Sequence, residues 1–296
     1  MGMLREIRRR ITGTRKTQQI TKAMKMVAAA KLRRAQENIL SARPYARKMN
    51  ELLQHLVAKV DPHLHPLLVQ REVQRVALVV VTADRGLCGA FNANLLRTAV
   101  AHIDRQYQQM NREGRLMVVC VGRKGFEFFK KRLYNLLSSH IHIFNVLDFS
   151  HAVEIVTKIA DGYLKGGFDK VEVVYNEFKS VIQQRVVIEQ FLPIPAEEVR
   201  PSERGFVQLV DYIYEPSSKE IVDALVPKHL NFQMWRMLLE SNAAEQGARM
   251  TAMANATENA RELIDTLLLS FNKARQAAIT KEILEVVSGA EALKTA

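Results

Sequence analysis

Apolar and small residues recur at alternating spacings of three and four along the first sixty residues. From Leu32 onward they form an uninterrupted stripe, made of Leu32, Ala35, Ile39, Ala42, Ala46, Met49, Leu53, Leu56 and Val60. Leu4, Ile7 and Ile11 begin a similar stripe, but its register continues to Gln18, Thr21 and Lys25. This spacing is typical of a helix that packs along another helix. It predicts one long helix over residues 1–60, with Pro44 as a possible bend and a seam that fails near Thr21.

The middle of the chain has a different pattern, in which short apolar runs alternate with longer amphipathic segments. Strands are expected at 76–81, 116–121, 170–178 and 181–191, and helices at 91–110, 125–137 and 151–164. Alternation of this kind predicts an α/β domain with a mainly parallel sheet. The last two strands are separated by very few residues, which predicts an antiparallel hairpin extension. We place this Rossmann-like central domain at residues 70–215, with a last extended piece at 206–214.

A second segment of helical composition covers residues 217–290. Ser217 and Glu220 occupy the S-x-x-E positions of a capping box, and from there to about Ser288 only Pro227 and Gly247 interrupt helical composition. The positions expected to face inward are often small, which allows two helices to approach closely: Ala244, Ala248, Thr251, Ala256, Ala260, Leu263, Leu267, Ala274 and Ala278.

Helix length decides how the three segments combine. At about 1.5 Å per residue the first helix would be roughly 85 Å long and the second roughly 105 Å, whereas the central domain would be only about 40 Å across. Neither helix can be covered by that domain, and a lone helix gains little stability from propensity. The predicted fold class is therefore α/β, with a long antiparallel two-helix coiled coil formed by the two ends of the chain.

Charge is concentrated in the first segment. The formal net charge is +12, and residues 1–60 carry all of it, with fifteen Lys or Arg and three Glu. The C-terminal segment is nearly neutral, and the longest apolar run, Val76–Val81, is far shorter than the roughly 20 residues of a membrane span. These features predict a soluble, cytosolic chain with one basic helix, centred on the stretch from Thr21 to Gln36.

Candidate chemistry is sparse. The turn Thr82–Phe91 follows a strand and precedes a helix, where phosphate can bind, but it lacks the third glycine of GxGxxG, and the chain has no Gly-Lys dipeptide for a Walker A loop. Cys88 and Cys120 occur singly and are expected to be reduced structural thiols. The histidine pairs at 63/65 and 140/142 have no ligand partners at metal-binding spacing. No catalytic, cofactor or metal site is predicted.

A nucleic-acid-binding coiled coil is the alternative function, because a basic helix that runs into heptads resembles a basic-region zipper. Such proteins pair parallel copies of one helix, whereas this chain carries a second helix of matching length at its other end. Interleaved aromatic residues are also missing, since Tyr45 is the first aromatic residue of the segment. A membrane-surface helix is disfavoured because the bases from Lys22 to Arg34 are not confined to one face.

Three motifs resemble one family. They are ITKAMKMVAAAKLRRAQ at 20–36 with SARPYA at 41–46, TADRGLCGAFN at 82–92, and ARMTAMANATENA at 248–260 with ARQAAITKEILEVVSGAEAL at 274–293. Over its whole length the chain resembles the gamma subunit of bacterial F-type ATP synthases. The resemblance implies a central rotor that couples ion-driven rotation of the membrane c ring to the catalytic sites of the beta subunits, for ATP synthesis or hydrolysis. The gamma subunit itself would be non-catalytic and would hold no cofactor.

The resemblance also implies partners and contact residues. One copy would lie inside a ring of three alpha and three beta subunits, bind epsilon and rest on the c ring, as a peripheral protein at the cytoplasmic face of the bacterial inner membrane. The residues expected to contact beta subunits are Lys22, Met24, Lys25, Lys31, Arg33, Arg34, Arg249, Arg275, Gln276, Thr280 and Glu282. The foot beside the c ring and epsilon would be formed by Tyr212, Tyr214 and Glu215.

Overall fold

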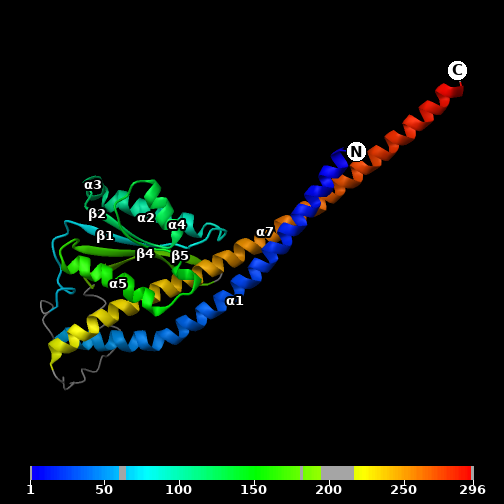
Figure 1. Ribbon diagram of the computed structural model, residues 1–296. Coiled ribbons are helices and arrows are strands. Elements are labelled where there is room, and N and C mark those ends of the chain that lie inside the picture. The colour runs from blue at the N-terminus through cyan, green and yellow to red at the C-terminus, as the bar shows by residue number, and fades with distance from the viewer. Residues whose placement is uncertain (1, 60–64, 181–182, 195–216, 295–296) are drawn as a thin grey trace. The chain divides into compact units, whose positions relative to one another are not determined.

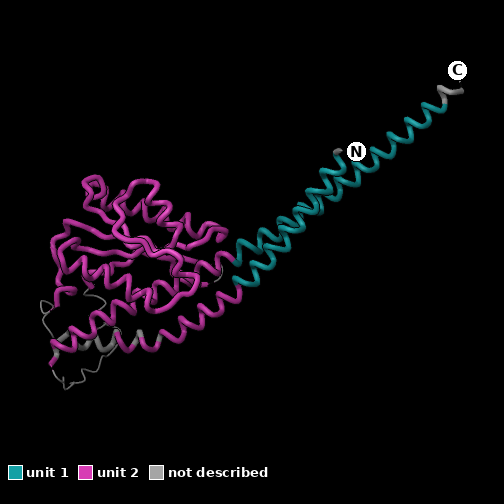
Figure 2. Tube along the Cα trace, in the orientation of Figure 1, with its two compact units in different colours: residues 1–28, 250–296 teal, residues 29–249 magenta. Residues whose placement is uncertain are grey.

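A computed structural model describes residues 2–59, 65–180, 183–194 and 217–294, and Figure 1 shows their helices and strands. The chain divides into two compact units, one of residues 1–28 and 250–296 and one of residues 29–249 (Figure 2). Helix α1 (Gly2–Lys59) and helix α7 (Ser218–Lys294) each contribute to both units. Helix α1 continues through Pro44 without a break, and the Ser217 hydroxyl accepts a hydrogen bond from the Glu220 N–H at the start of α7.

The first unit is an antiparallel pair of helices. The hydroxyl oxygens of Thr21 and Thr257 lie 2.8 Å apart, and the Arg8 guanidinium lies 5.9 Å from the ring centre of Phe271. Moving toward the N-terminus of α1 therefore means moving toward the C-terminus of α7. The buried seam positions come from both helices: Ile11, Thr21 and Ala28 from α1, and Met253, Ala260 and Ile264 from α7.

Two details of the predicted seam are wrong. The seam does not fail at Thr21, which is buried. Its hydroxyl donates to the Gln18 carbonyl and accepts a hydrogen bond from the Thr257 hydroxyl. After Thr21 it continues through half-buried Met24 to buried Ala28, while Lys25 is exposed. On α7 the inward position is Ile264, and Leu263 is half exposed. A threonine can occupy a seam because its methyl group packs while its hydroxyl bonds to its own helix.

The second unit contains a five-stranded sheet of order β3-β2-β1-β4-β5. Strands β1 (Val76–Val81), β2 (Leu116–Val121), β3 (Leu136–His140) and β4 (Lys170–Phe178) are parallel, and β5 (Gln184–Leu192) pairs antiparallel with β4. The helices between them are α2 (Phe91–Gln106), α3 (Gln108–Arg112), α4 (Arg123–Lys131), the 3-10 turn η2 (Ile143–Asn145) and α5 (Phe149–Leu164). The mainly parallel sheet with an antiparallel hairpin is confirmed.

The predicted helix over 125–137 is wrong in its second half. Helix α4 ends at Lys131. Leu136 and Leu137, which the prediction placed at the end of the helix, belong instead to the edge strand β3. The chain leaves α4 through Leu133, whose φ of 58° lies in the left-handed region. The helix predicted over 91–110 is likewise divided at Tyr107, whose φ is −131°.

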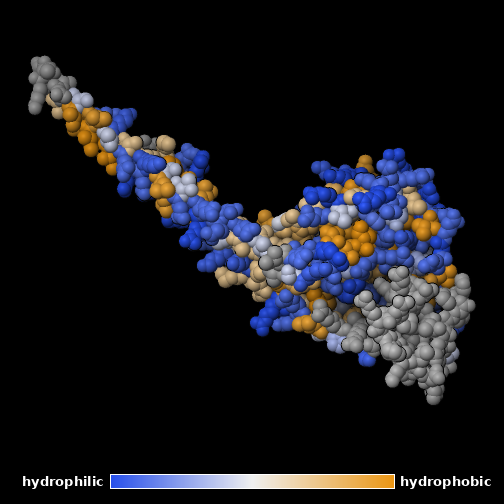
Figure 3. All heavy atoms as spheres, turned by 180° about the vertical axis from the view of Figure 1, so that it is seen from behind, coloured by the Kyte–Doolittle hydropathy of each residue, from blue (hydrophilic) through white to orange (hydrophobic). Residues whose placement is uncertain are grey.

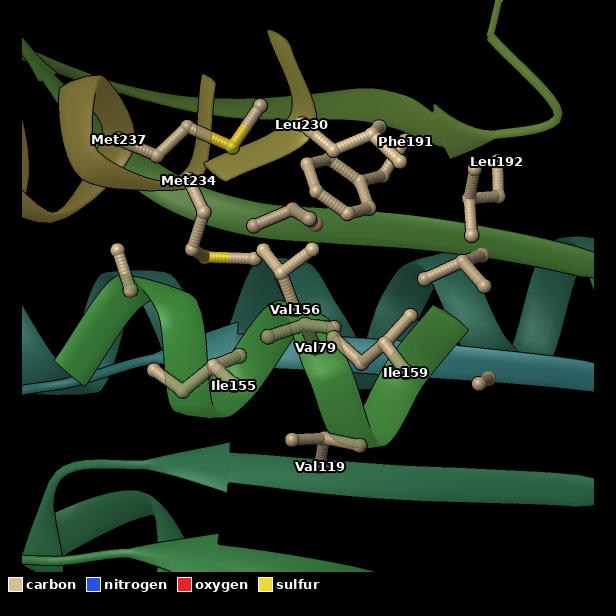
Figure 4. Packing of buried hydrophobic residues seen from close by; sticks show 14 of the residues in the cluster. Val79, Val119, Ile155, Val156, Ile159, Phe191, Leu192, Leu230, Met234 and Met237 are labelled. Atoms are coloured by element: carbon tan, nitrogen blue, oxygen red, sulfur yellow. The ribbon is translucent and has the colours of Figure 1, made fainter. Parts of the chain in front are cut away.

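Both faces of the sheet are covered by apolar side chains. On one face α5 and α7 pack against β1, β2, β4 and β5, where Val79, Ile155, Leu192 and Met234 meet in one cluster (Figure 4). On the other face α2 and α4 contribute Leu95, Ile103 and Phe129. The β1 strand is fully buried along its length, as its unbroken run of apolar residues predicts.

His229 on α7 is buried, and burial lowers its pKa from 6.5 to about 4, with the charge of Arg236 acting in the same direction. Between pH 6.5 and 4 the His229 side chain binds a proton in the unfolded chain but not in the folded chain. The folded protein should therefore become less stable as the pH falls through this range. The full effect would be about 3 kcal/mol. Urea unfolding across this range should show a smaller loss for His229→Gln than for the native chain, and equal losses would contradict the assignment.

Candidate interaction surface

The basic stretch of α1 presents its charges to solvent. Lys22 and Lys25 are exposed in the first unit, and Lys31, Arg33 and Arg34 are exposed in the second. Only Arg33 has an ion pair among the described contacts of these five, a 3.1 Å contact with Glu37. Both side chains of that pair are well exposed, so the pair contributes little to stability. The positive charge of the stretch is therefore available to a partner.

Apolar side chains lie between these charges. Ile20, Met26 and Val27 are each more than half exposed, with 57–59% of their surfaces accessible. Met24, which was predicted as a contact residue, is half-buried and belongs to the seam side of the helix. Alanines at 28–30 keep the side chains between Val27 and Lys31 short. The stretch is thus a helix surface of low relief that combines positive charge with scattered apolar groups.

The far part of α7 is exposed in the same way. Arg275, Gln276, Thr280 and Glu282 are all exposed. Large apolar residues accompany them, and Ile279, Ile283, Leu284, Val286 and Val287 are each about half exposed or more. In Figure 3 orange apolar groups are visible beside blue hydrophilic ones toward the C-terminal end of α7. Such a helix surface is typical of a segment that partners cover.

The turn after β1 is organised by Asp84. Its Oδ1 accepts hydrogen bonds from the N–H groups of Arg123 (3.0 Å) and His142 (2.8 Å), and its Oδ2 accepts one from Phe144 (3.2 Å). Thr82 closes the base of the same turn, because its hydroxyl accepts from the Gly125 N–H at 2.8 Å. The carboxylate therefore joins the ends of three parallel strands. The Asp84 side chain therefore has a structural role in the fold.

A glycine is required where α4 begins. Gly122 has φ of 91°, and a Cβ atom placed there would lie 2.1 Å from the Thr82 carbonyl oxygen. Close packing therefore requires a glycine at 122, whereas a Cβ atom at Gly86 in the turn after β1 would meet no atom within 4 Å.

Arg249 of α7 forms a hydrogen bond with the turn after β1. Its Nη1 donates to the Gly86 carbonyl at 2.6 Å, and its Nη2 lies 2.6 Å from Glu245. Both side chains are largely buried, and burial raises the pKa of Glu245 while Arg249 opposes that rise. Glu245 was not predicted from the sequence, although its spacing of four from Arg249 is a signal for an ion pair on one helix face. Of the predicted contact residues, Arg249 alone has this built-in anchoring role.

Other candidate chemistry is weak. Cys88 and Cys120 are buried free thiols, and burial raises both pKa values, to about 12 for Cys120. Within the described ranges no three His, Cys, Asp or Glu side chains are grouped as metal ligands. In the same part of the chain no helix is long and apolar enough to cross a membrane. The predicted foot residues Tyr212, Tyr214 and Glu215 lie outside the described residues.

The fold defines a class: a chain with an α/β unit whose N- and C-terminal helices also pair in an antiparallel two-helix unit and expose basic and apolar side chains. Comparison with known proteins identifies the family. A family model described as ATP synthase matches residues 3–293. The ATP synthase gamma chain of Chloroherpeton thalassium is 55% identical over 301 residues, with 99% of each chain covered. The chain therefore belongs to the gamma-subunit family of F-type ATP synthases.

Solved structures agree in fold. A chain of the Tetrahymena thermophila mitochondrial ATP synthase central stalk and c ring is 26% identical, with a TM-score of 0.58 over 80% of this chain and 99% of that one. A chain of the Euglena gracilis mitochondrial OSCP/F1/c-ring structure is 20% identical, with a TM-score of 0.70 over 99% of this chain and 95% of that one. Membership in this family makes the chain a part of a membrane-associated ATP synthase complex.

Proposed function

We propose that this chain is the central rotor shaft of an F-type ATP synthase. It couples ion-driven rotation of the c ring to conformational changes at the catalytic sites of the beta subunits. The observation that carries the proposal is the exposed, basic and low-relief surface of α1 on a helix whose opposite side packs in an antiparallel seam with α7. The central-stalk relatives and the gamma chains of similar length support it.

The surface suits a shaft that turns against three chemically identical neighbours. Deep interlocking contacts would have to be broken at every step, so their barriers would oppose rotation. Charge attraction acts over a longer range and steers an approach without fixing one geometry. Lys22, Lys25, Lys31, Arg33 and Arg34 would supply the positive half of that attraction, and Ile20, Met26 and Val27 would supply a shallow apolar bearing.

The other contacts follow from the family. Met24 and Arg249 would lie beside beta subunits, as would the exposed group near the end of α7: Arg275, Gln276, Thr280 and Glu282. Tyr212, Tyr214 and Glu215 would form the foot beside epsilon and the c ring. One copy would serve a ring of three alpha and three beta subunits, at the cytoplasmic face of the bacterial inner membrane. The chain would perform no covalent chemistry of its own.

Reconstitution tests this function. The purified chain alone should hydrolyse no ATP above background, and it should copurify with the alpha and beta subunits of its own complex. Adding it to those subunits should produce ATP hydrolysis and rotation of a bead fixed to the chain. Hydrolysis by the isolated chain would contradict its non-catalytic role. Retention on duplex DNA that weakens steeply with salt would favour the nucleic-acid alternative.

A further inference from the structure

The turn that leaves α4 is not used by the proposed rotor surface. It has the sequence Lys130-Lys131-Arg132-Leu133, and all four residues are exposed. Leu133 is 92% exposed, the highest value among the exposed large apolar residues. Leu137, on the adjoining edge strand, is 41% exposed. The turn therefore combines a protruding aliphatic side chain with three cations.

The backbone conformation makes this leucine more unusual. The Leu133 N–H donates to the Lys130 carbonyl (3.2 Å) and the Tyr134 N–H donates to the Phe129 carbonyl (3.2 Å). These two hydrogen bonds form a Schellman motif, whose left-handed position usually holds glycine. Leu133 occupies that position with φ of 58°. The chain thus accepts both an unfavourable backbone conformation and an exposed apolar group at one residue.

The neighbouring cations are held in place by aromatic rings. The Arg132 guanidinium lies 3.7 Å from the ring centre of Phe128, and the Lys130 ammonium lies 5.3 Å from that of Phe126. Phe129 supports the cluster from below with edge contacts to Phe128 and Tyr134. A guanidinium stacked on a ring loses little freedom when it binds a carboxylate with two parallel hydrogen bonds.

We propose that the Lys130–Leu133 turn is a docking site for an acidic segment of another protein subunit of the same complex. Leu133 inserts into an apolar pocket of that segment, and Arg132 pairs with a carboxylate at the pocket rim. Arginine is one of the residues enriched among interface hot spots, which lie in well-packed, desolvated pockets. The proposal requires assembly into the complex, and it is independent of the contacts proposed for the basic stretch of α1.

A fixed geometry favours a protein over a lipid surface. Attraction of cations to anionic lipids is diffuse and gains nothing from a guanidinium held on a phenyl ring. Insertion into a bilayer also usually uses several apolar side chains, whereas Leu133 protrudes alone with Leu137 only partly exposed beside it. A rigid cation next to one protruding leucine matches a shaped pocket with a carboxylate at its edge.

Photocrosslinking in the intact purified complex tests the proposal. A photoreactive benzophenone side chain replaces exposed Asn135, two residues from Leu133, and the products are mapped by mass spectrometry. We expect a crosslink to a segment of another subunit that contains carboxylates beside apolar residues. The yield should fall at least about tenfold in Leu133→Gly and in Arg132→Gln, as expected for loss of a hot-spot residue. The same probe at Leu164, which is half exposed on α5, is the positional control.

Leu133→Gly separates docking from folding. Glycine is the preferred residue at this left-handed position, so the variant should unfold at the same or a higher denaturant concentration than the native chain. An unchanged crosslink yield in both variants would overturn the proposal. So would the absence of any protein crosslink at Asn135, or a crosslink to lipid accompanied by flotation of the chain on phosphatidylglycerol vesicles.

Discussion

Reversing the charge of Lys22, Lys25, Lys31, Arg33 and Arg34 to Glu should uncouple the complex while leaving the chain folded. ATP-driven ion pumping by the reconstituted complex should fall at least about tenfold, because like charges facing each other across an interface cost several kcal/mol. ATP hydrolysis should fall less, since the catalytic sites are proposed to lie on other subunits. The ratio of ions pumped to ATP hydrolysed is therefore the measurement that reports the effect.

The fold should tolerate these five changes for two reasons. All five side chains are exposed, and the ion pair that they make with the described residues, Arg33 with Glu37, has both partners in solvent. Glutamate also has nearly the helix propensity of lysine and arginine, so α1 should keep its helicity. Circular dichroism of the isolated variant should match that of the native chain.

A matched variant controls for net charge. Five exposed bases of the α/β domain can be reversed to Glu instead: Arg75, Arg97, Arg105, Arg112 and Lys165. This variant has the same net charge as the first one, but it leaves the basic stretch intact, so it should pump normally. Normal pumping by the variant in which the five bases of α1 are reversed would contradict the proposed electrostatic contact. Equal losses in both variants would attribute the effect to overall charge.

Much of the fold follows from hydrophobic periodicity. The strands β1 and β2 were predicted with their observed bounds, because buried parallel strands read as short apolar runs between turns. The pairing of the two terminal helices followed from their length, which no central domain of this size could cover. These are features in which local pattern and global fold agree.

The edge strand β3 could not be predicted in the same way. Its sequence LLSSH is short and lacks β-branched residues, and it follows α4 after only four residues. The helical pattern of α4 therefore appeared to continue, and the left-handed turn at Leu133 gave no glycine signal. Similarly, the buried Thr21 was invisible to an apolar pattern, because its burial depends on the partner position Thr257, 236 residues away.

The candidate surface was predictable where it rests on composition. The basic stretch stands out by charge, and the structure leaves its five bases exposed. The anchoring of the Asp84 turn by Arg249 and Glu245 depends on residues far apart in sequence, so no local pattern could reveal it. The contacts of the predicted surface residues with partner subunits depend on other chains, so they stay predictions.

Replacing Arg236 with Met should destabilise the α/β unit by about 2–3 kcal/mol, somewhat less than the 3–5 kcal/mol typical of breaking a fully buried pair. Arg236 of α7 donates to Glu189 of β5 at 2.7 Å, to Glu240 at 3.4 Å and to the Tyr175 hydroxyl at 3.3 Å. About a third of the Arg236 side chain is exposed, which reduces the cost. The carboxylates of Glu189 and Glu240 would stay where they are and would no longer have Arg236 as their cationic partner.

The single tryptophan provides the measurement. Trp235 adjoins Arg236 and makes an edge contact with Phe149 at 5.9 Å, so its fluorescence should report urea unfolding of this unit. Removing the acids as well, in Glu189→Leu/Arg236→Met/Glu240→Leu, should recover most of the lost stability, since no unpaired charge would remain buried. A triple variant less stable than Arg236→Met would show that apolar packing, rather than charge, explains the loss.

The pH dependence of the loss distinguishes charge from shape. Burial already raises the pKa of Glu240 in the native chain, although Arg236 opposes that rise. Without Arg236, the pKa of Glu240 should rise further, and protonation would then remove the unpaired charge. The stability difference between the native chain and Arg236→Met should therefore be full at neutral pH and shrink as the pH falls toward the ordinary carboxyl pKa of about 4.3. A difference that stays constant across this range would mean that Arg236 stabilises the unit through its packing alone.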